Sequence, residues 1–276
     1  MTTCEQLRER LEAAGVENAP QEARWMTELA RRENADDTAL TARLDEWTRR
    51  RIVGEPFQYV VGSVEFYNIE LAVGPGVLIP RPETELLVER SLHLLAETPS
   101  GTEVLDLCTG SGAIPLALAH ERSDLAYIGI DLSPEALAWA ERNRAVLKPP
   151  QCQFLCGDLF TPLGTPRPRF QLITANPPYV SPDEYRCLPS EVKDFEPRLA
   201  LEADDDGMAL EKRIADEARS HLHPGGWLLL EIGESQGARL AEHLQSLGYQ
   251  EVAILKDLAG RDRIAQAQWR PLTSNL

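Results

Sequence analysis

The amino-acid sequence predicts an α/β fold in which a doubly wound parallel sheet follows a small N-terminal helical domain. From about residue 80 onward, short apolar runs typical of buried strands alternate with helical segments. This alternation indicates a parallel sheet with helices on both faces. Earlier residues show helical periodicity alone. The chain has 276 residues, of which 43% are hydrophobic, which is enough for one or two domains with a sizeable core.

Apolar residues at helical spacing indicate three amphipathic helices between residue 3 and about residue 53. Leu7 with Leu11, and Leu40 with Leu44, show the spacing. This part of the chain has no glycine-rich loop and no cluster of candidate catalytic groups. We therefore predict that residues 1–54 form a helical bundle that docks the substrate and takes no part in the chemistry.

The next segment, residues 55–79, is predicted to be a β-hairpin that links the two domains. Its runs FQYVVG and EFYNIELAV are rich in β-branched and aromatic residues, and a turn cluster at residues 74–76 follows them.

The remaining segment, residues 80–276, is predicted to hold the catalytic sheet. Helices are expected at residues 83–96, 208–222 and 235–247. One further helix is expected to end at residue 120, and another to begin at residue 134. Strands are expected at residues 103–108, 127–131, 152–156, 170–176, 227–233, 251–257 and 263–269. Only a short turn separates the last two strands, so we expect them to pair antiparallel at one edge of the sheet.

Composition disfavours several classes of protein. The 28 lysines and arginines face 44 aspartates and glutamates, and the net charge of −16 repels a nucleic-acid backbone. No apolar run has the length of a membrane span, and the N-terminus has no apolar signal segment, so we predict a cytoplasmic protein with no membrane contact. The five cysteines are scattered and predicted to be reduced, and no metal site is expected, the acidic tract at residues 202–207 included.

Acidic residues and a glycine-rich turn follow three successive predicted strands. The turn, D-L-C-T-G-S-G at residues 106–112, lets the backbone approach a ligand closely, but it lacks the third glycine of a dinucleotide site and the lysine of a P-loop. Asp131 ends the next strand, where a carboxylate can accept hydrogen bonds from both ribose hydroxyls. Asp158 is predicted to face an adenine amino group, and Leu159 its ring. The pattern resembles the Rossmann-like class I S-adenosylmethionine-dependent methyltransferases, whose cofactor has no phosphates.

The fourth strand of this sheet runs into N-P-P-Y, residues 176–179. Two consecutive prolines fix φ and remove two N–H donors, which leaves the Asn176 side-chain oxygen and the Pro177 carbonyl as acceptors. These oxygens could receive both hydrogens of a planar NH2 group while Tyr179 packs against its flat face. The motif therefore predicts methylation of an amide or of an exocyclic base amine.

Longer segments make the chain similar to the HemK/PrmC family of protein-(glutamine-N5) methyltransferases, which modify the GGQ glutamine of class I peptide chain release factors. The similar segments are GEPFQY (54–59), GVLIPRPETE (76–85), DLCTGSGAI (106–114), DLSPEAL (131–137), FEPRLAL (195–201) and DLAGRDR (257–263).

The resemblance implies an S-adenosylmethionine site and a substrate site. The implied cofactor contacts are Cys108, Thr109, Gly110, Ser111, Gly112, Asp131, Leu159 and Asn176. The implied glutamine contacts are Asn176, Pro177, Pro178 and Tyr179, and residues 81–85 border the same pocket. The implied partner is a class I release factor. No direct nucleic-acid contact is expected from the net charge of −16, and a monomer is favoured, although the sequence does not give the oligomeric state.

Two other enzymatic activities and one non-enzymatic role stay open. Related enzymes that act on a ribosomal-protein glutamine often have cysteine at the position of Cys108. An adenine-N6 nucleic-acid methyltransferase would use the same N-P-P-Y geometry, although the net charge of −16 disfavours it. A methyltransferase-like adaptor without activity is the third alternative, because fold alone does not establish function.

Overall fold

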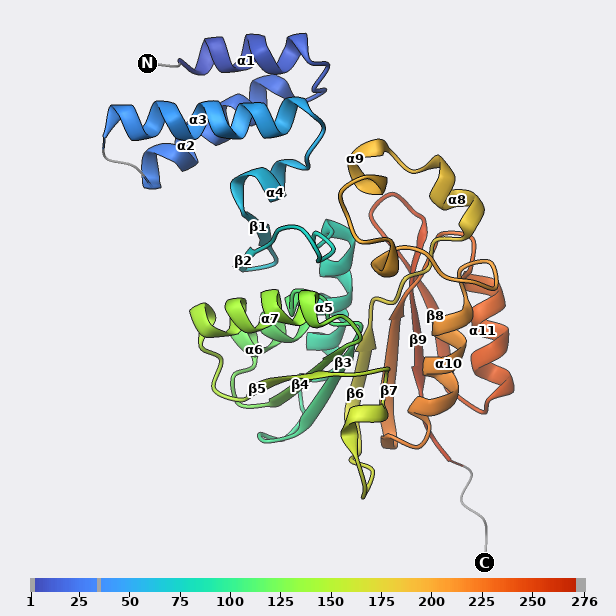
Figure 1. Ribbon diagram of the computed structural model, residues 1–276. Coiled ribbons are helices and arrows are strands. Elements are labelled where there is room, and N and C mark those ends of the chain that lie inside the picture. Colours follow the sequence, from blue (N-terminus) through green and yellow to red (C-terminus); the bar gives the residue numbers. More distant parts are fainter. Residues whose placement is uncertain (1–2, 34–35, 272–276) are drawn as a thin grey trace, which may run out of the picture.

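The computed structural model describes residues 3–33 and 36–271, and in these residues a seven-stranded sheet has the order β5-β4-β3-β6-β7-β9-β8 (Figure 1). Strands β3 to β7 run parallel, whereas β9 and β8 pair antiparallel at one edge, as predicted. Their bounds are β3 Glu103–Leu107, β4 Ala126–Asp131, β5 Cys152–Cys156, β6 Phe170–Ala175, β7 Leu222–Glu231, β8 Gln250–Lys256 and β9 Asp262–Gln268. The chain leaves β3 toward β5 and returns to β6 beside β3, and ligands bind at such reversals.

Helices cover both faces of the sheet because neighbouring strand residues point to opposite sides. In β7, Leu229 packs with the helices of one face, while Leu228 and Leu230 belong to the core of the other. The first group comprises α5 Glu85–Leu94, preceded by the 3-10 turn η1 Pro82–Thr84, with α6 Ala113–Glu121 and α7 Pro134–Leu147. The second comprises α10 Ala209–Ala218 and α11 Gly237–Ser246. The doubly wound α/β architecture predicted from the sequence is confirmed.

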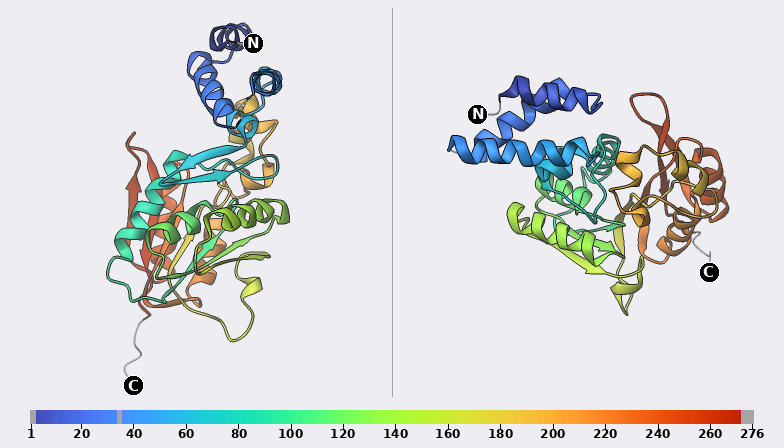
Figure 2. Two further views of the ribbon diagram at one scale, coloured as in Figure 1. Left: turned by 90° about the vertical axis from the view of Figure 1, so that its left-hand side faces the viewer. Right: turned by 45° about the horizontal axis from the view of Figure 1, so that its top comes forward.

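The N-terminal bundle consists of the predicted helices α1 Cys4–Ala13, α2 Ala19–Glu33 and α3 Asp37–Ile52. It has its own apolar core, which includes Leu7, Leu44 and Trp47. Figure 2 shows that the bundle projects from the body of the molecule. A separate core is what an independent docking module requires.

The prediction of a strand in FQYVVG is wrong, because Phe57–Val61 forms the short helix α4. Gly62 ends this helix in the left-handed conformation (φ 86°). Val60 fills the core of the bundle, while Tyr59 packs into a neighbouring cluster and donates a hydrogen bond to the Val77 carbonyl. Burial on both sides thus outweighs the strand propensity of the run. The predicted hairpin lies later, as β1 Ser63–Phe66 and β2 Ile69–Ala72.

An arch of short elements follows N-P-P-Y and was not predicted. It contains α8 Pro182–Cys187, α9 Ser190–Lys193 and the 3-10 turn η3 Arg198–Ala200, while another such turn, η2 Thr161–Leu163, follows β5. Arg51 of the bundle pairs with Glu22 at 2.7 Å and with Glu191 of α9 at 3.1 Å, which ties the bundle to the arch. Within the described ranges, no helix is long and apolar enough to cross a membrane.

Candidate active site

A pocket lies where β3, β4, β5 and β6 end, at the carboxyl edge of the sheet. Most of the predicted site residues line it: Cys108, Thr109, Gly110, Ser111, Asp131, Asp158, Leu159, Asn176 and Pro178. Gly112, Pro177 and Tyr179 are not among its lining residues. Gly112 is needed for another reason, because it starts α6 at φ 79° and a Cβ there would lie 2.7 Å from the Phe154 ring.

Asp131 holds the glycine-rich loop through its carboxylate. Oδ2 accepts a hydrogen bond from the Gly110 N–H at 2.8 Å, and Oδ1 accepts one from the Ser133 N–H at 2.9 Å. Burial raises the pKa of Asp131 above its ordinary value, against the lowering by these two backbone donors. Each oxygen keeps further acceptor capacity for a ligand hydroxyl. The sequence predicted the ligand contact but missed this second task of fixing the loop.

Cys108 stands next to this loop and is the thiol nearest to the predicted chemistry. Its backbone is left-handed, with φ 54°, and its side chain packs against the main core. Burial first, and then the neighbouring carboxylates, raises its pKa well above the ordinary thiol value. A neutral thiol is a poor nucleophile, so the residue contributes shape to the pocket and no covalent chemistry.

Asp158 lines the pocket, but its carboxylate already has a partner. Arg213 of α10 binds it at 2.9 Å, and both side chains are about half exposed. An adenine amino group facing Asp158 would therefore share its carboxylate with Arg213. Leu159 is buried with a left-handed backbone (φ 46°), at the place where the sequence predicted a packing surface for adenine.

Asn176 places its amide between the pocket and the start of α5. Its Nδ2 donates a hydrogen bond to Thr84 Oγ1 at 3.1 Å. With the nitrogen so engaged, the side-chain oxygen is the end that remains to accept from a ligand. Tyr179 turns away from the pocket, and its hydroxyl donates to Glu231 Oε1 at 3.1 Å.

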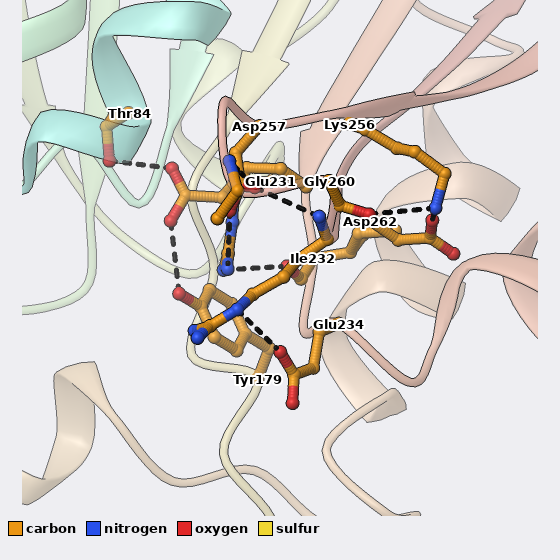
Figure 3. A network of polar contacts seen from close by, with 12 residues as sticks. Thr84, Tyr179, Glu231, Ile232, Glu234, Lys256, Asp257, Gly260 and Asp262 are labelled. Carbon is orange, nitrogen blue, oxygen red and sulfur yellow. Dashed lines mark hydrogen bonds and ion pairs between the residues drawn. The ribbon is translucent and has the colours of Figure 1, made fainter.

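Glu231 was not predicted from the sequence as a member of the site, and Thr84 was predicted only as part of the segment 81–85 that borders the pocket. Thr84 occupies the N-cap position of α5, yet its hydroxyl donates to Glu231 Oε2 at 2.6 Å, as Figure 3 shows. Glu231 is the last residue of β7 and is 1% exposed. An acidic residue that ends the apolar run WLLLE is a detectable signal, but the sequence does not reveal its partners.

The pocket suits a cation without phosphates. None of the lysines, arginines or histidines in the described part of the chain lines it, whereas two carboxylates, Asp131 and Asp158, do. A phosphate-bearing cofactor would lack a counter-charge here, while a sulfonium would not. The lining therefore fits S-adenosylmethionine: Asp131 would hold the ribose, Leu159 the adenine, and the loop from Cys108 to Gly112 the remainder.

The acidic tract at residues 202–207 is engaged in ion pairs. Glu202 pairs with Arg198, and Asp206 pairs with Arg239. Among the residues the structure places, no three histidine, cysteine or acidic side chains are grouped as metal ligands.

Comparison with known proteins adds three findings. Residues 99–259 match the family model of a methyltransferase domain. A release factor glutamine methyltransferase of Thermodesulfovibrio yellowstonii is 42% identical over 218 residues, 78% of this chain and 77% of that protein. Another of the same name, from Geobacter sulfurreducens, is 35% identical over 91% of this chain and 89% of its own length.

A solved structure supports the fold. The 16S rRNA N2 G1207 methyltransferase of T. thermophilus, in complex with AdoMet and guanosine, has a TM-score of 0.54 at 21% identity. The superposition covers 75% of this chain and 50% of that one.

Proposed function

Because this chain belongs to the release factor glutamine methyltransferases, we propose that it methylates the side-chain amide nitrogen (N5) of the GGQ glutamine in class I peptide chain release factors. It is an S-adenosylmethionine-dependent methyltransferase. The observation that carries the substrate proposal is the orientation of Asn176, whose nitrogen is bound to Thr84 and whose oxygen stays available as an acceptor. A planar NH2 group needs such an acceptor.

The chemical difficulty is the weak nucleophilicity of an amide nitrogen, whose lone pair is delocalised. Asn176 Oδ1 and the Pro177 carbonyl would each accept one N–H of the glutamine amide, which turns the lone pair toward the methyl group and stabilises the positive charge that develops on nitrogen. When bound, S-adenosylmethionine supplies a methyl carbon on a sulfonium, whose C–S bond breaks as the N–C bond forms. The nitrogen then carries an extra proton, is strongly acidic and loses that proton to solvent.

This scheme needs no strong base in the pocket. Among the described lining residues there is no histidine, and the Cys108 thiol stays protonated because burial raises its pKa. Orientation and electrostatic stabilisation therefore provide the rate enhancement. The adenine-N6 alternative shares the geometry, but the net charge of −16 repels a phosphate backbone.

The direct test is mass spectrometry of a class I release factor incubated with the enzyme and S-adenosylmethionine. We expect one methyl group on the GGQ glutamine, none when that glutamine is replaced by glutamate, and methylation slower on the order of a hundredfold or more when the enzyme carries Asn176→Ala. Whole ribosomal proteins and duplex DNA serve as parallel substrates. Methylation confined to either of them would overturn the proposal.

We further propose that the helical bundle, residues 1–54, binds the body of the release factor. Residues 55–79 would link this bundle to the catalytic domain, residues 80–276. In support, the bundle has its own core, and Arg51 near its end binds Glu191 of the arch that follows N-P-P-Y. Val53, two residues after Arg51, is 69% accessible. We expect Val53→Ser to raise KM for the whole release factor about fivefold, as loss of about 1 kcal/mol of apolar contact implies. A short GGQ peptide should be unaffected.

Val146 on α7 provides the matched control, because it is equally apolar, 71% exposed and far from the bundle in sequence. Val146→Ser should leave KM for the whole release factor unchanged. Equal effects of the two substitutions would place docking elsewhere. Monomeric state, cytoplasmic location and lack of nucleic-acid contact stay predictions.

A further inference from the structure

We propose that Glu231, acting through the hydroxyl of Thr84, decides which end of the Asn176 amide faces the pocket. The inference rests on the proposed function, since it concerns how Asn176 comes to present an acceptor to a substrate NH2 group. Glu231 is not among the residues that line the pocket, so its role is that of a positioning residue.

The argument begins with the single hydrogen of the Thr84 hydroxyl. Thr84 Oγ1 lies 2.6 Å from Glu231 Oε2 and donates its hydrogen there. Its oxygen can then only accept, and the neighbour at 3.1 Å is Nδ2 of Asn176. Thr84 is 3% exposed and Glu231 1%, so water does not compete for the bond between them, which fixes the direction of the Thr84 hydroxyl. Asn176 must therefore direct its nitrogen to Thr84 and its oxygen the other way.

The direction of donation depends on a Glu231 carboxylate with no proton. Its second oxygen, Oε1, accepts from the Tyr179 hydroxyl at 3.1 Å, so both oxygens act as acceptors (Figure 3). If Glu231 were protonated, or replaced by a neutral amide, it could donate a hydrogen bond to the Thr84 hydroxyl. Thr84 would then be free to donate its own hydrogen to Asn176 Oδ1. The amide would then rotate and present its NH2 group to the substrate NH2, where two donors repel each other.

The groups that face Glu231 come from several elements. Thr84 and Tyr179 donate to it, Arg263 of β9 contributes a positive charge, and Glu83 a negative one. Arg263 is held in place by the Ile232 carbonyl at 3.3 Å and by Asp257 at 3.4 Å. The segment D-L-A-G-R-D-R, residues 257–263, forms the β8–β9 turn and the start of β9, and its last residue, Arg263, supplies the cation that favours the ionised carboxylate.

Burial works in the opposite direction and raises the pKa of Glu231 above the ordinary carboxyl value, more than the two hydroxyls and Arg263 lower it. Protonation on acidification therefore begins at a higher pH than for an exposed glutamate. We therefore expect the pH profile of the wild-type enzyme to have an acid limb, on which kcat at saturating substrate and cofactor falls as the pH is lowered and Glu231 becomes protonated.

The test compares Thr84→Val with Thr84→Ser, assayed on a release-factor GGQ peptide. Valine keeps the shape of threonine and removes the hydroxyl, and we expect kcat to fall on the order of tenfold or more. Serine restores the hydroxyl and should recover most of that turnover. Glu231→Gln should be slow and should lose the acid limb of the pH profile. A purely structural role would leave the shape of that profile unchanged.

A second readout needs no substrate. In enzyme labelled with 15N-asparagine, exchange of the Asn176 Nδ2 hydrogens with solvent should be slow in the wild type and fast in Thr84→Val. Equal turnover and equal exchange in Thr84→Val and Thr84→Ser would overturn the inference. If instead the wild type methylates no release-factor glutamine, the proposed function fails, and the exchange measurement still decides the orientation of Asn176.

Discussion

The two ends of the pocket are built in different ways. At the cofactor end, Asp131 binds backbone N–H groups 21 and 2 residues away in the chain. At the amide end, Asn176 binds Thr84 across 92 residues, and Thr84 binds Glu231 across 147. The cofactor end is thus a local structure of two strand ends, whereas the amide end exists only after distant elements have packed.

A buried glutamate lies near each end of the pocket, and the two carboxylates differ in their hydrogen-bond partners. Glu231, at the amide end, has hydroxyl partners for both oxygens. Glu211 of α10 follows Leu210, which lines the pocket. Glu211 itself is fully buried, and neither of its carboxylate oxygens has a hydrogen-bond partner among the residues that the structure describes. The difference indicates that the network around Glu231 is a built feature, since burial alone does not provide partners for a carboxylate.

The largest expected effect separates chemistry from cofactor binding. Asn176→Ala removes the acceptor for the amide but leaves Asp131 and the glycine-rich loop, so turnover should fall on the order of a hundredfold or more, while cofactor affinity changes little. Single-turnover kinetics at saturating cofactor measure this. Asn176→Asp should also be slow, because it cannot donate to Thr84 and adds a negative charge beside the sulfonium. Near-normal rates in both variants would place the chemistry elsewhere.

The converse substitution acts on the cofactor end. Asp131→Ala removes the acceptor for the ribose hydroxyls and for the Gly110 N–H, and should cost about 1.5–3 kcal/mol of S-adenosylmethionine binding, roughly ten- to 150-fold in Kd. Titration calorimetry provides the measurement, and Asp131→Asn, which keeps one oxygen, should be intermediate. Unchanged affinity in a folded Asp131→Ala protein would refute the assigned role.

The third prediction concerns Glu211, whose pKa burial raises to about 8. The folded state holds this proton more tightly than the unfolded chain, so the stabilisation is complete below about pH 4.3 and is lost as pH rises through about 8. Glu211→Leu should remove this contribution and exceed the wild type in unfolding free energy by about 1–3 kcal/mol at pH 9. Urea denaturation at pH 5 and pH 9 measures it. If the gain in unfolding free energy of Glu211→Leu over the wild type were no larger at pH 9 than at pH 5, the ionisation of a buried Glu211 would be contradicted.

The smallest effect concerns the ion pair at the pocket rim. Asp158 and Arg213 are about half exposed, so their pair contributes less than about 1 kcal/mol. If Asp158 contacts adenine, Asp158→Asn should weaken cofactor affinity by about twofold to fivefold, while Arg213→Ala, which frees the carboxylate, should not weaken it. Equal weakening by both would show that the pair acts as a unit in holding the rim, without a cofactor contact of its own.

The pieces of the site that lie next to strand ends were predictable from the sequence. The glycine-rich turn and N-P-P-Y follow apolar strands, and Asp131 is the last residue of another. Parallel strands bring their carboxyl ends to one edge of the sheet. The helix α4 was not predictable, because its two flanking cores decide its conformation. The partner of Asp158 was missed for a similar reason, since Arg213 lies 55 residues away.

By itself, the sequence determined the class of fold, which polar groups stand at the ends of successive strands, and the acceptor-rich motif that would bind an amide. Only the tertiary structure decided which way that motif faces, through Thr84 and Glu231. The physical reason is that local patterns encode backbone conformation and which side of an element is apolar. The partner of a buried hydroxyl or carboxylate depends instead on which distant side chains arrive within about 3 Å of it, and packing alone sets that distance.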